Sequence, residues 1–249
     1  MPDFPNLPLP GFPFRMVAAF LLVSFPALLS AGEARLPEAA ARPSQAQVPE
    51  SPASGPAQAS EAGEALRKSI AYHRDAKDLA LKFQASVYNA ALDKQDRYQG
   101  RLLLKGAARF RLEIPGGTYV CDGESYWEYH AQNHQVILKK AKDMEDKPLP
   151  GEVLLRFLDS EPLSIGRAVD GGKGFLELRL DPSRAMKNLD SLSVLLDQKD
   201  YSVHRISSRD VSGNEAEYTV ASIKRNTGLK DKEFIFSVPK GAEVVDMRE

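Results

Sequence analysis

Few residues of this chain combine a reactive type with a spacing that chemistry requires. His130 and His134 have the i, i+4 spacing of metal ligands, but residues 131–133 predict a hairpin turn, and no carboxylate is clearly placed as a third ligand. Cys121, the only cysteine, has no histidine beside it, and Ser125 lacks the G-x-S-x-G turn of serine hydrolases. We therefore expect no catalytic residue, no metal, no cofactor and a small buried side chain at Cys121.

Two further patterns resemble binding motifs by composition alone. Residues 171–174, Gly-Gly-Lys-Gly, lack the spacing of a phosphate-binding loop and lie between predicted strands, so we expect a hairpin turn there. Lys139, Lys140 and Lys142 predict a basic edge strand whose charges deter pairing with another sheet edge.

Composition narrows the class of protein. The 249 residues are 43% hydrophobic and 27% charged, which is enough for one or two domains with a proper core. Lys and Arg total 33 against 34 Asp and Glu, so no basic surface for nucleic acid is expected. A single cysteine excludes an internal disulfide framework.

The first quarter of the chain has the composition of a targeting segment followed by a linker. Residues 16–31 form an apolar run behind Arg15, interrupted by Pro26 and followed by small residues, which predicts a signal peptide over residues 1–34. The alternative is an uncleaved anchor, although the run is shorter than the roughly 20 residues of a membrane-spanning helix. Residues 35–63 are rich in Pro and Ala without aromatic residues, which predicts a disordered linker.

The elements that would position any site lie in residues 64–249. A 3.6-residue period predicts a helix over 64–78, a second helix is expected over 147–158, and Met186–Leu189 predicts a helical turn. The remainder alternates with period two. It predicts eleven strands: Phe83–Val87, Arg101–Lys105, Arg109–Ile114, Ser125–His130, Val136–Lys142, Ser164–Val169, Phe175–Leu180, Ser191–Leu196, Ser202–Ser208, Ala216–Lys224 and Glu233–Val238.

This pattern predicts a mainly β (α+β) domain, a strongly curved, incomplete antiparallel barrel of about eleven strands with a helical lid. Such a sheet has room inside for an apolar ligand. Patterning alone favours the other possibility, a closed core in which the inward side chains meet one another.

Several segments, in order along the chain, resemble one family. They are Phe83-Gln-Ala-Ser-Val87, Gly100-Arg-Leu-Leu-Leu-Lys105, Arg109-Phe-Arg-Leu-Glu113, Val120-Cys-Asp-Gly-Glu-Ser-Tyr-Trp-Glu-Tyr129 and Phe234-Ile-Phe-Ser-Val-Pro-Lys-Gly241. The order is similar to the periplasmic outer-membrane lipoprotein carrier family, LolA-type, over roughly residues 66–246. One departure is that Gly106 and Ala107 stand where the family's best-studied branch has an arginine that helps to close the lid, and a proline.

The resemblance implies a monomeric periplasmic carrier that is not an enzyme. It would hold the acyl chains of lipoproteins, receive them from an inner-membrane ATP-driven exporter and deliver them to an outer-membrane acceptor. The side chains expected to line the cavity are Phe83, Val87, Leu102, Leu104, Phe110, Leu112, Ile114, Trp127, Tyr129, Val136, Leu138, Leu154, Phe157, Leu176, Leu178 and Leu180.

Two alternatives remain open. The same fold could serve a related periplasmic lipid-binding or envelope-sensing protein that acts through a protein partner. A secreted hydrolase would need a Ser or Cys, a His and a carboxylate within hydrogen-bond reach.

Overall fold

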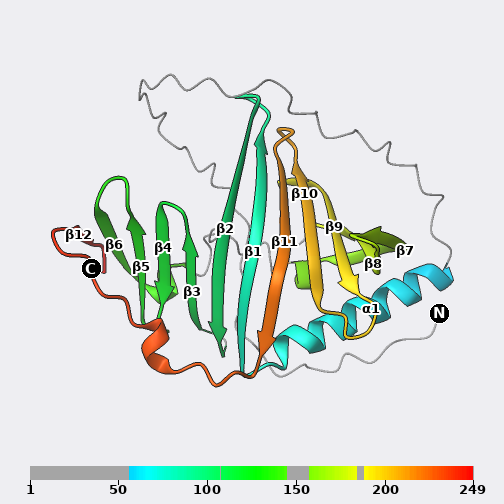
Figure 1. Cartoon of the computed structure of the whole chain (residues 1–249), viewed down its shortest axis with the longest axis horizontal. Coiled ribbons are helices and arrows are strands. Elements are labelled where there is room, and N and C mark those ends of the chain that lie inside the picture. The colour runs from blue at the N-terminus through cyan, green and yellow to red at the C-terminus, as the bar shows by residue number, and fades with distance from the viewer. Residues whose placement is uncertain (1–55, 107, 145–156, 184–187, 249) are drawn as a thin grey trace.

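The computed structural model describes residues 56–106, 108–144, 157–183 and 188–248 (Figure 1). The predicted signal peptide, linker residues 35–55, residues 147–156 of the expected second helix and residues 186–187 of the expected turn lie outside the described residues. Among the described helices, none combines the length and apolarity needed to cross a bilayer.

One helix and one large sheet form the described part of the fold. The helix is α1 (Pro56–Arg74). The strands are β1 (Asp78–Asn89), β2 (Lys94–Lys105), β3 (Arg109–Ile114), β4 (Gly117–Cys121), β5 (Ser125–His130), β6 (Gln135–Lys140), β7 (Glu161–Asp170), β8 (Lys173–Asp181), β9 (Leu189–Asp197), β10 (Val203–Asp210), β11 (Glu215–Arg225) and β12 (Glu243–Asp246). Three short 3-10 helices lie between the strands in the described residues: η1 (Ala141–Met144), η2 (Phe157–Asp159) and η3 (Asp231–Phe234).

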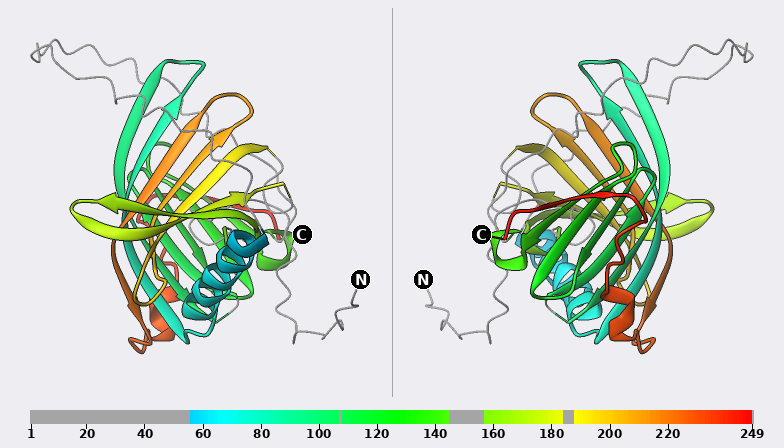
Figure 2. Two further views of the ribbon diagram at one scale, coloured as in Figure 1. Left: turned by 90° about the vertical axis from the view of Figure 1, so that its right-hand side faces the viewer. Right: turned by 90° about the vertical axis from the view of Figure 1, so that its left-hand side faces the viewer.

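The strands form one sheet in the order β12-β6-β5-β4-β3-β2-β1-β11-β10-β9-β8-β7. We call β1–β6 the first wing and β7–β11 the second wing; the pairing of β1 with β11 joins them. The sheet curls around α1, which lies on its concave side (Figure 2). The expectation of a mainly β, strongly curved open sheet is confirmed.

The strand count and the last strand differ from the prediction. Residues Gly117–Cys121 and Glu243–Asp246 are strands, whereas Glu233–Val238 is not, so the described sheet has twelve strands. Phe234 lies in η3 and is buried, because this segment packs across the sheet rather than extending it. β12 pairs with β6 in parallel, the exception in an otherwise antiparallel sheet.

That parallel pair corrects the expectation of a basic edge strand only in part, because Lys139 and Lys140 lie just beyond the residues of β6 that pair with β12. β6 is not an edge strand, since β12 pairs along it from Gln135 to Leu138. Lys142 lies in η1.

Helix α1 begins earlier than the sequence pattern predicts. The linker was expected to continue to residue 63, but residues 56–63 are helical. Alanine, which made this segment resemble a spacer, is also the residue with the highest helix propensity. Ala62, Ala65 and Leu66 are buried at helical spacing, so tertiary packing stabilises the first turns.

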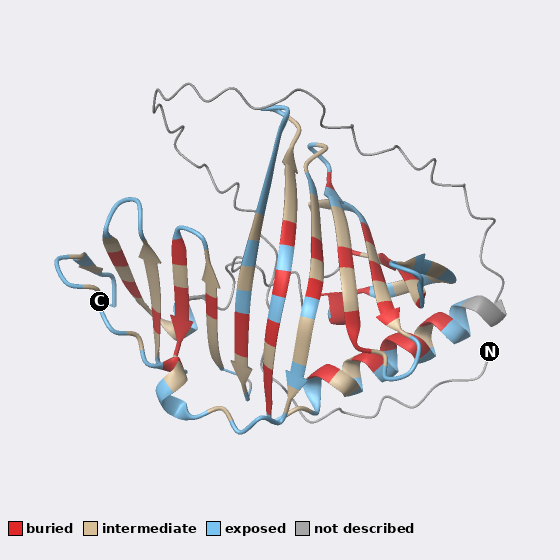
Figure 3. Cartoon of the chain, viewed as in Figure 1, coloured by how far each residue is buried: buried red, intermediate tan, exposed pale blue. Residues whose placement is uncertain are grey.

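The two faces of the sheet carry separate apolar cores. Burial alternates along β1 and β9, so that every second side chain faces the concave side (Figure 3). The concave core includes Phe83, Leu112, Val194 and Ile206, together with the buried face of α1.

The convex core lies under residues 226–247, which we call the strap. Leu103, Val120, Val136 and Leu138 point to this side, and Phe234 of the strap is buried with them. Ion pairs join the strap to the first wing: Asp231 accepts hydrogen bonds from Lys105 (2.7 Å) and Arg109 (2.8 Å). The first wing is therefore apolar on both faces.

A buried carboxylate fixes the start of the strap. Asp78, at the beginning of β1, accepts hydrogen bonds from the backbone N–H and hydroxyl of Thr227 and from the backbone N–H groups of Gly228 and Leu229. Burial raises the pKa of Asp78, but these four donors outweigh burial, and its pKa lies below the ordinary value.

Candidate functional site

The concave face is the candidate binding surface, and Phe83 lies at its centre. Phe83 pairs with Gly100 on β2 and with Val220 on β11. A Cβ at Gly100 would lie 2.3 Å from the Phe83 ring, so the ring covers the space that a side chain would occupy. Glycine is required here by close approach rather than by backbone conformation.

In the second wing, the concave face is packed against α1. Leu178 pairs with Val194, which pairs with Ile206, and all three are fully buried. Helix α1 packs against β7 and η2 here, and its Ala62 and Leu66 join the same cluster. This half of the concave face is a filled core.

A buried histidine connects α1 to its neighbours in the second wing. The backbone N–H of Val203 donates to His73 Nε2 (3.4 Å), Nδ1 lies 2.7 Å from the Ser69 carbonyl, and the ring meets Phe157 edge-on at 5.9 Å. Burial lowers the pKa of His73 to about 4.

Several apolar side chains on the concave side of the first wing remain partly accessible. Leu104, Phe110 and Ile114 are only partly buried, although they belong to the same apolar rows as the buried Leu102 and Leu112. Partly accessible apolar surface therefore lies over β2 and β3, and Ile165 and Leu176 of the second wing are partly buried too.

Most residues predicted to line a cavity do face the concave side. Those that belong to its core or pack against it are Phe83, Leu102, Leu104, Phe110, Leu112, Ile114, Phe157, Leu176, Leu178 and Leu180. Val87 shares this face of β1 but is half-buried beside Asp96, and Leu154 lies outside the described residues. Lipid contact by any of these residues remains a prediction.

Four of the predicted lining residues are on the wrong face. Trp127 pairs with Val120, and the pairs Trp127–Leu138 and Tyr129–Val136 continue the convex row. The Trp127 ring stacks on Phe236 of the strap at 5.6 Å. Trp127, Tyr129, Val136 and Leu138 therefore face the convex core, because the strap supplies a second apolar layer that alternation alone does not reveal.

The sequence reasoning missed the inward-facing tyrosines. Tyr119 and Tyr126 lie on the concave side of β4 and β5, and Tyr98 and Tyr218 flank Ala85 there. The signal was present in the turns: once Leu112 faces inward, the tight turn at residues 115–116 pairs it with Tyr119.

Burial raises the pKa of these tyrosines. The pKa of Tyr119 rises to about 12, and those of Tyr98, Tyr126 and Tyr218 also lie above the ordinary value. All four side chains are therefore neutral at physiological pH.

Charged side chains lie beside these tyrosines on β5 and β6. Glu128 Oε2 accepts a hydrogen bond from Lys139 Nζ (3.3 Å), and Glu128 Oε1 lies 2.9 Å from His130 Nε2. The side chains of Glu128 and Lys139 are only 20% and 18% exposed. They thus form a half-buried ion pair on the binding face.

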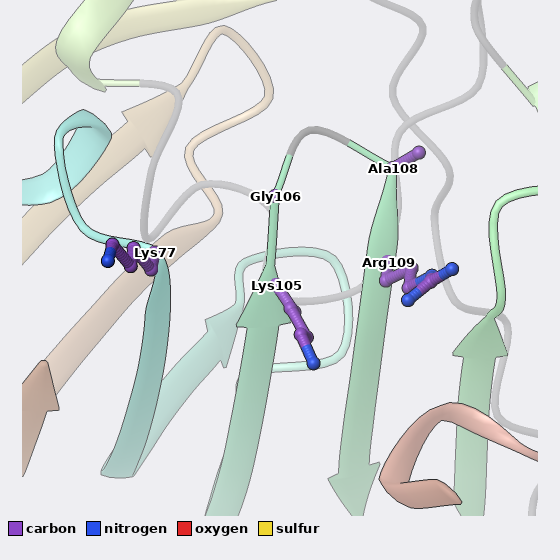
Figure 4. A pocket seen from close by; sticks show the side chains of 5 residues that line it. All are labelled: Lys77, Lys105, Gly106, Ala108 and Arg109. Atoms are coloured by element: carbon purple, nitrogen blue, oxygen red, sulfur yellow. The ribbon is translucent and has the colours of Figure 1, made fainter. Parts of the chain in front are cut away.

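An open hollow of about 480 Å³ lies at the end of the β2–β3 hairpin, lined by Lys77, Lys105, Gly106, Ala108 and Arg109 (Figure 4). Lys105 and Arg109 already pair with Asp231. Gly106 stands where the family's best-studied branch has the arginine that helps to close the lid. Its φ is +59°, and a Cβ built there would have no neighbour within 4 Å. Three of its five lining residues are cationic, and two of these cations are paired with Asp231.

The residues considered for chemistry do not converge. His130 and His134 flank the β5–β6 turn, as expected, and Cys121 is buried with its pKa raised by burial. In the part of the chain that the structure describes, no three His, Cys, Asp or Glu side chains gather as a metal site. Residues 171–172 form the expected hairpin turn between β7 and β8.

Comparison with known proteins gives one family. The family model described as "Outer membrane lipoprotein carrier protein LolA" matches residues 74–237. The outer-membrane lipoprotein carrier protein of Aeromonas salmonicida (strain A449) is 24% identical over 192 residues, which are 76% of this chain and 90% of that protein.

Solved structures with a similar chain path are more distant. An uncharacterised conserved protein from Thermus thermophilus has a TM-score of 0.47 and 18% identity, over 75% of this chain and 99% of that one. A LolA superfamily protein from Nitrosomonas europaea has a TM-score of 0.36 and 13% identity, over 70% and 97%.

Proposed function

Because the chain belongs to the LolA family of outer membrane lipoprotein carrier proteins, we propose that it is a periplasmic carrier that shields the acyl chains of lipoproteins on its concave face. On this proposal the protein receives its cargo from an inner-membrane ATP-driven exporter and delivers it to an outer-membrane acceptor. Residues 1–34 would be a cleaved signal peptide and residues 35–55 a linker.

One observation supports the proposal most directly. The concave face of the first wing presents partly buried apolar side chains, Leu104, Phe110 and Ile114, in line with a fully buried core. Removing a CH₂ group from water is worth ~0.8 kcal/mol, so an acyl chain laid on this row gains several kcal/mol. A surface of this kind can bind a lipid through apolar contacts, without any covalent or catalytic step.

The layout also supports release of the cargo on this proposal. A carrier has to release its cargo, so the apolar surface has to be accessible rather than sealed. Helix α1 packs against β7 of the second wing, whereas the row on β2 and β3 lies farther along the sheet. We therefore assign acyl binding to the first wing.

The test is titration of the purified protein with a fluorescent acyl probe. Wild type is expected to bind one probe per chain, and Ile114→Asp, which places a charge in the accessible row, is expected to weaken binding more than tenfold. Val238→Asp is the matched control, because Val238 lies on the strap and is 42% exposed.

Thermal unfolding of each variant checks that it is folded. Folded Ile114→Asp protein that binds the probe as tightly as wild type would contradict the assignment to the first wing. A folded wild type that binds no acyl probe would overturn the carrier function.

A further inference from the structure

The concave face of the first wing has a polar end. Tyr119 of β4 pairs with Glu128 of β5, and Tyr126 of β5 pairs with Lys139 of β6, so these side chains lie on the same face as Leu112. We call Tyr119, Tyr126, Glu128 and Lys139 the β4–β6 cluster. It borders the accessible apolar row, because the rings of Tyr126 and Phe110 are 6.0 Å apart.

The cluster contains more hydrogen-bond donors than acceptors. The Glu128 carboxylate is already engaged by Lys139 and His130. Tyr126 and Tyr119 are 1% and 7% exposed, and among the described residues neither hydroxyl has a side-chain or backbone hydrogen bond that affects its pKa. Both hydroxyls are therefore available to donate a hydrogen bond to a ligand on this face.

The ring of Tyr119 occupies the space that a side chain at Gly117 would take. A Cβ at Gly117 would lie 2.9 Å from the ring and 3.0 Å from the hydroxyl, so the ring lies over that glycine. His130 pairs with Gly117, and its ring meets Tyr119 edge-on at 6.4 Å. These two contacts place the Tyr119 ring between Gly117 and His130.

A hydroxyl that donates to an acceptor oxygen of a ligand adds a modest free energy of binding and orients the ligand. Charge decides between two kinds of acceptor. Lys139 is neutralised by Glu128, so the cluster has no spare cation to balance a phosphate group. It suits neutral acceptors, namely carbonyl oxygens, which accept hydrogen bonds and donate none.

We propose that the β4–β6 cluster binds the ester or amide carbonyl oxygens that link acyl chains to their glyceryl or amino group, with Tyr119 and Tyr126 as donors. The apolar row on β2 and β3 then takes the hydrocarbon chains. This assignment rests on the proposed function, since it places the polar end of the same ligand.

The test compares two lipopeptide probes that differ only at the linkage. One carries two ester-linked acyl chains, and the other carries two ether-linked alkyl chains of equal length, which lack the carbonyl oxygens. Wild type is expected to prefer the ester probe threefold to tenfold for each hydrogen bond gained.

Tyr126→Phe and Tyr119→Phe remove one hydroxyl each and keep the ring. Each is expected to reduce the preference for the ester probe threefold to tenfold while leaving the affinity for the ether probe unchanged. Tyr129→Phe is the matched control: Tyr129 lies on the same strand as Tyr126 but faces the convex side, so both affinities should stay at the wild-type values.

An undiminished ester preference in the double variant Tyr119→Phe/Tyr126→Phe would overturn the assignment, as would displacement of the ester probe by inorganic phosphate. Both results leave acyl binding intact and so leave the proposed function standing. Failure of wild type to bind either probe would instead overturn the proposed function itself.

Discussion

The first and second wings belong to one continuous sheet but are covered on opposite faces. The strap packs on the convex face of the first wing, where Phe234 and Leu103 are buried. Helix α1 packs on the concave face of the second wing, where Leu178 and Val194 are buried. Each wing thus has one face closed by a segment from elsewhere in the chain.

The face without such a cover carries charges in both wings. On the concave side of the first wing, Lys139 pairs with Glu128. On the convex side of the second wing, Asp170 accepts hydrogen bonds from His204 and Arg205, both at 2.7 Å. Hydrogen bonding to His204 and the charge of Arg205 hold the pKa of Asp170 below its ordinary value. Only the concave set adjoins an accessible apolar row, which is why that face is the candidate site.

The largest expected effect comes from removing the anchor of the strap. Phe234→Ala leaves a cavity in the convex core and is expected to destabilise the protein by about 3–5 kcal/mol. Hydrogen exchange should accelerate most in β5, β6 and the strap, and least in α1. Phe236→Ala is the control with a smaller expected loss, because Phe236 is only half-buried. Equal acceleration in both wings would contradict separate covering of the two faces.

Acid is expected to weaken the second wing through His73. Its pKa in the folded protein, about 4, lies below the ordinary value of 6.5, so folding favours the neutral ring. Stability from this group is therefore complete above pH 6.5 and is lost as the pH falls towards 4, by about 3 kcal/mol at most.

The measurement is the free energy of unfolding at pH 7 and pH 4 for wild type and His73→Gln. Carboxylates contribute equally to both proteins, so the difference between their pH dependences reports His73. Identical pH dependences would exclude His73 as the acid-sensitive group.

The smallest effect is expected at Asp231. Its side chain is 67% exposed, although hydrogen bonding to Lys105 and the charge of Arg109 lower its pKa. Exposed ion pairs contribute little, so Asp231→Asn should not measurably change the unfolding midpoint. A substantial drop would mean that the ion pairs, rather than Phe234, hold the strap on the first wing.

Alternation and turns predicted the sheet well because they are local signals. Leu102, Phe110 and Leu112 face inward as their period-two pattern indicates, and glycine turns at residues 116 and 171–172 occur where expected. At β5 the pattern did not show which alternate residues face the concave side, because aromatic residues occur on both faces of that strand. Tyr126 faces inward and Trp127 outward because of the strap, a long-range contact that a local pattern cannot carry.

The ends of the elements were harder to predict for the same reason. Phe234 and Phe236 have the spacing of a strand, but Phe234 ends in η3 because it fills the convex core. Ala62 reads as spacer composition, but burial against the second wing makes it helical. In both segments, tertiary packing decides between conformations that the local sequence leaves nearly equal.

The pairing of β1 with β11 has a consequence for the order of folding. Each wing is a meander of strands that are neighbours in sequence, whereas Leu79 pairs with Arg225 across most of the domain. Contacts between residues distant in sequence form slowly, because loop closure comes before any gain in contact energy. The two meanders can therefore form early, and β1, the first strand to be synthesised, has to wait for β11, which emerges almost last.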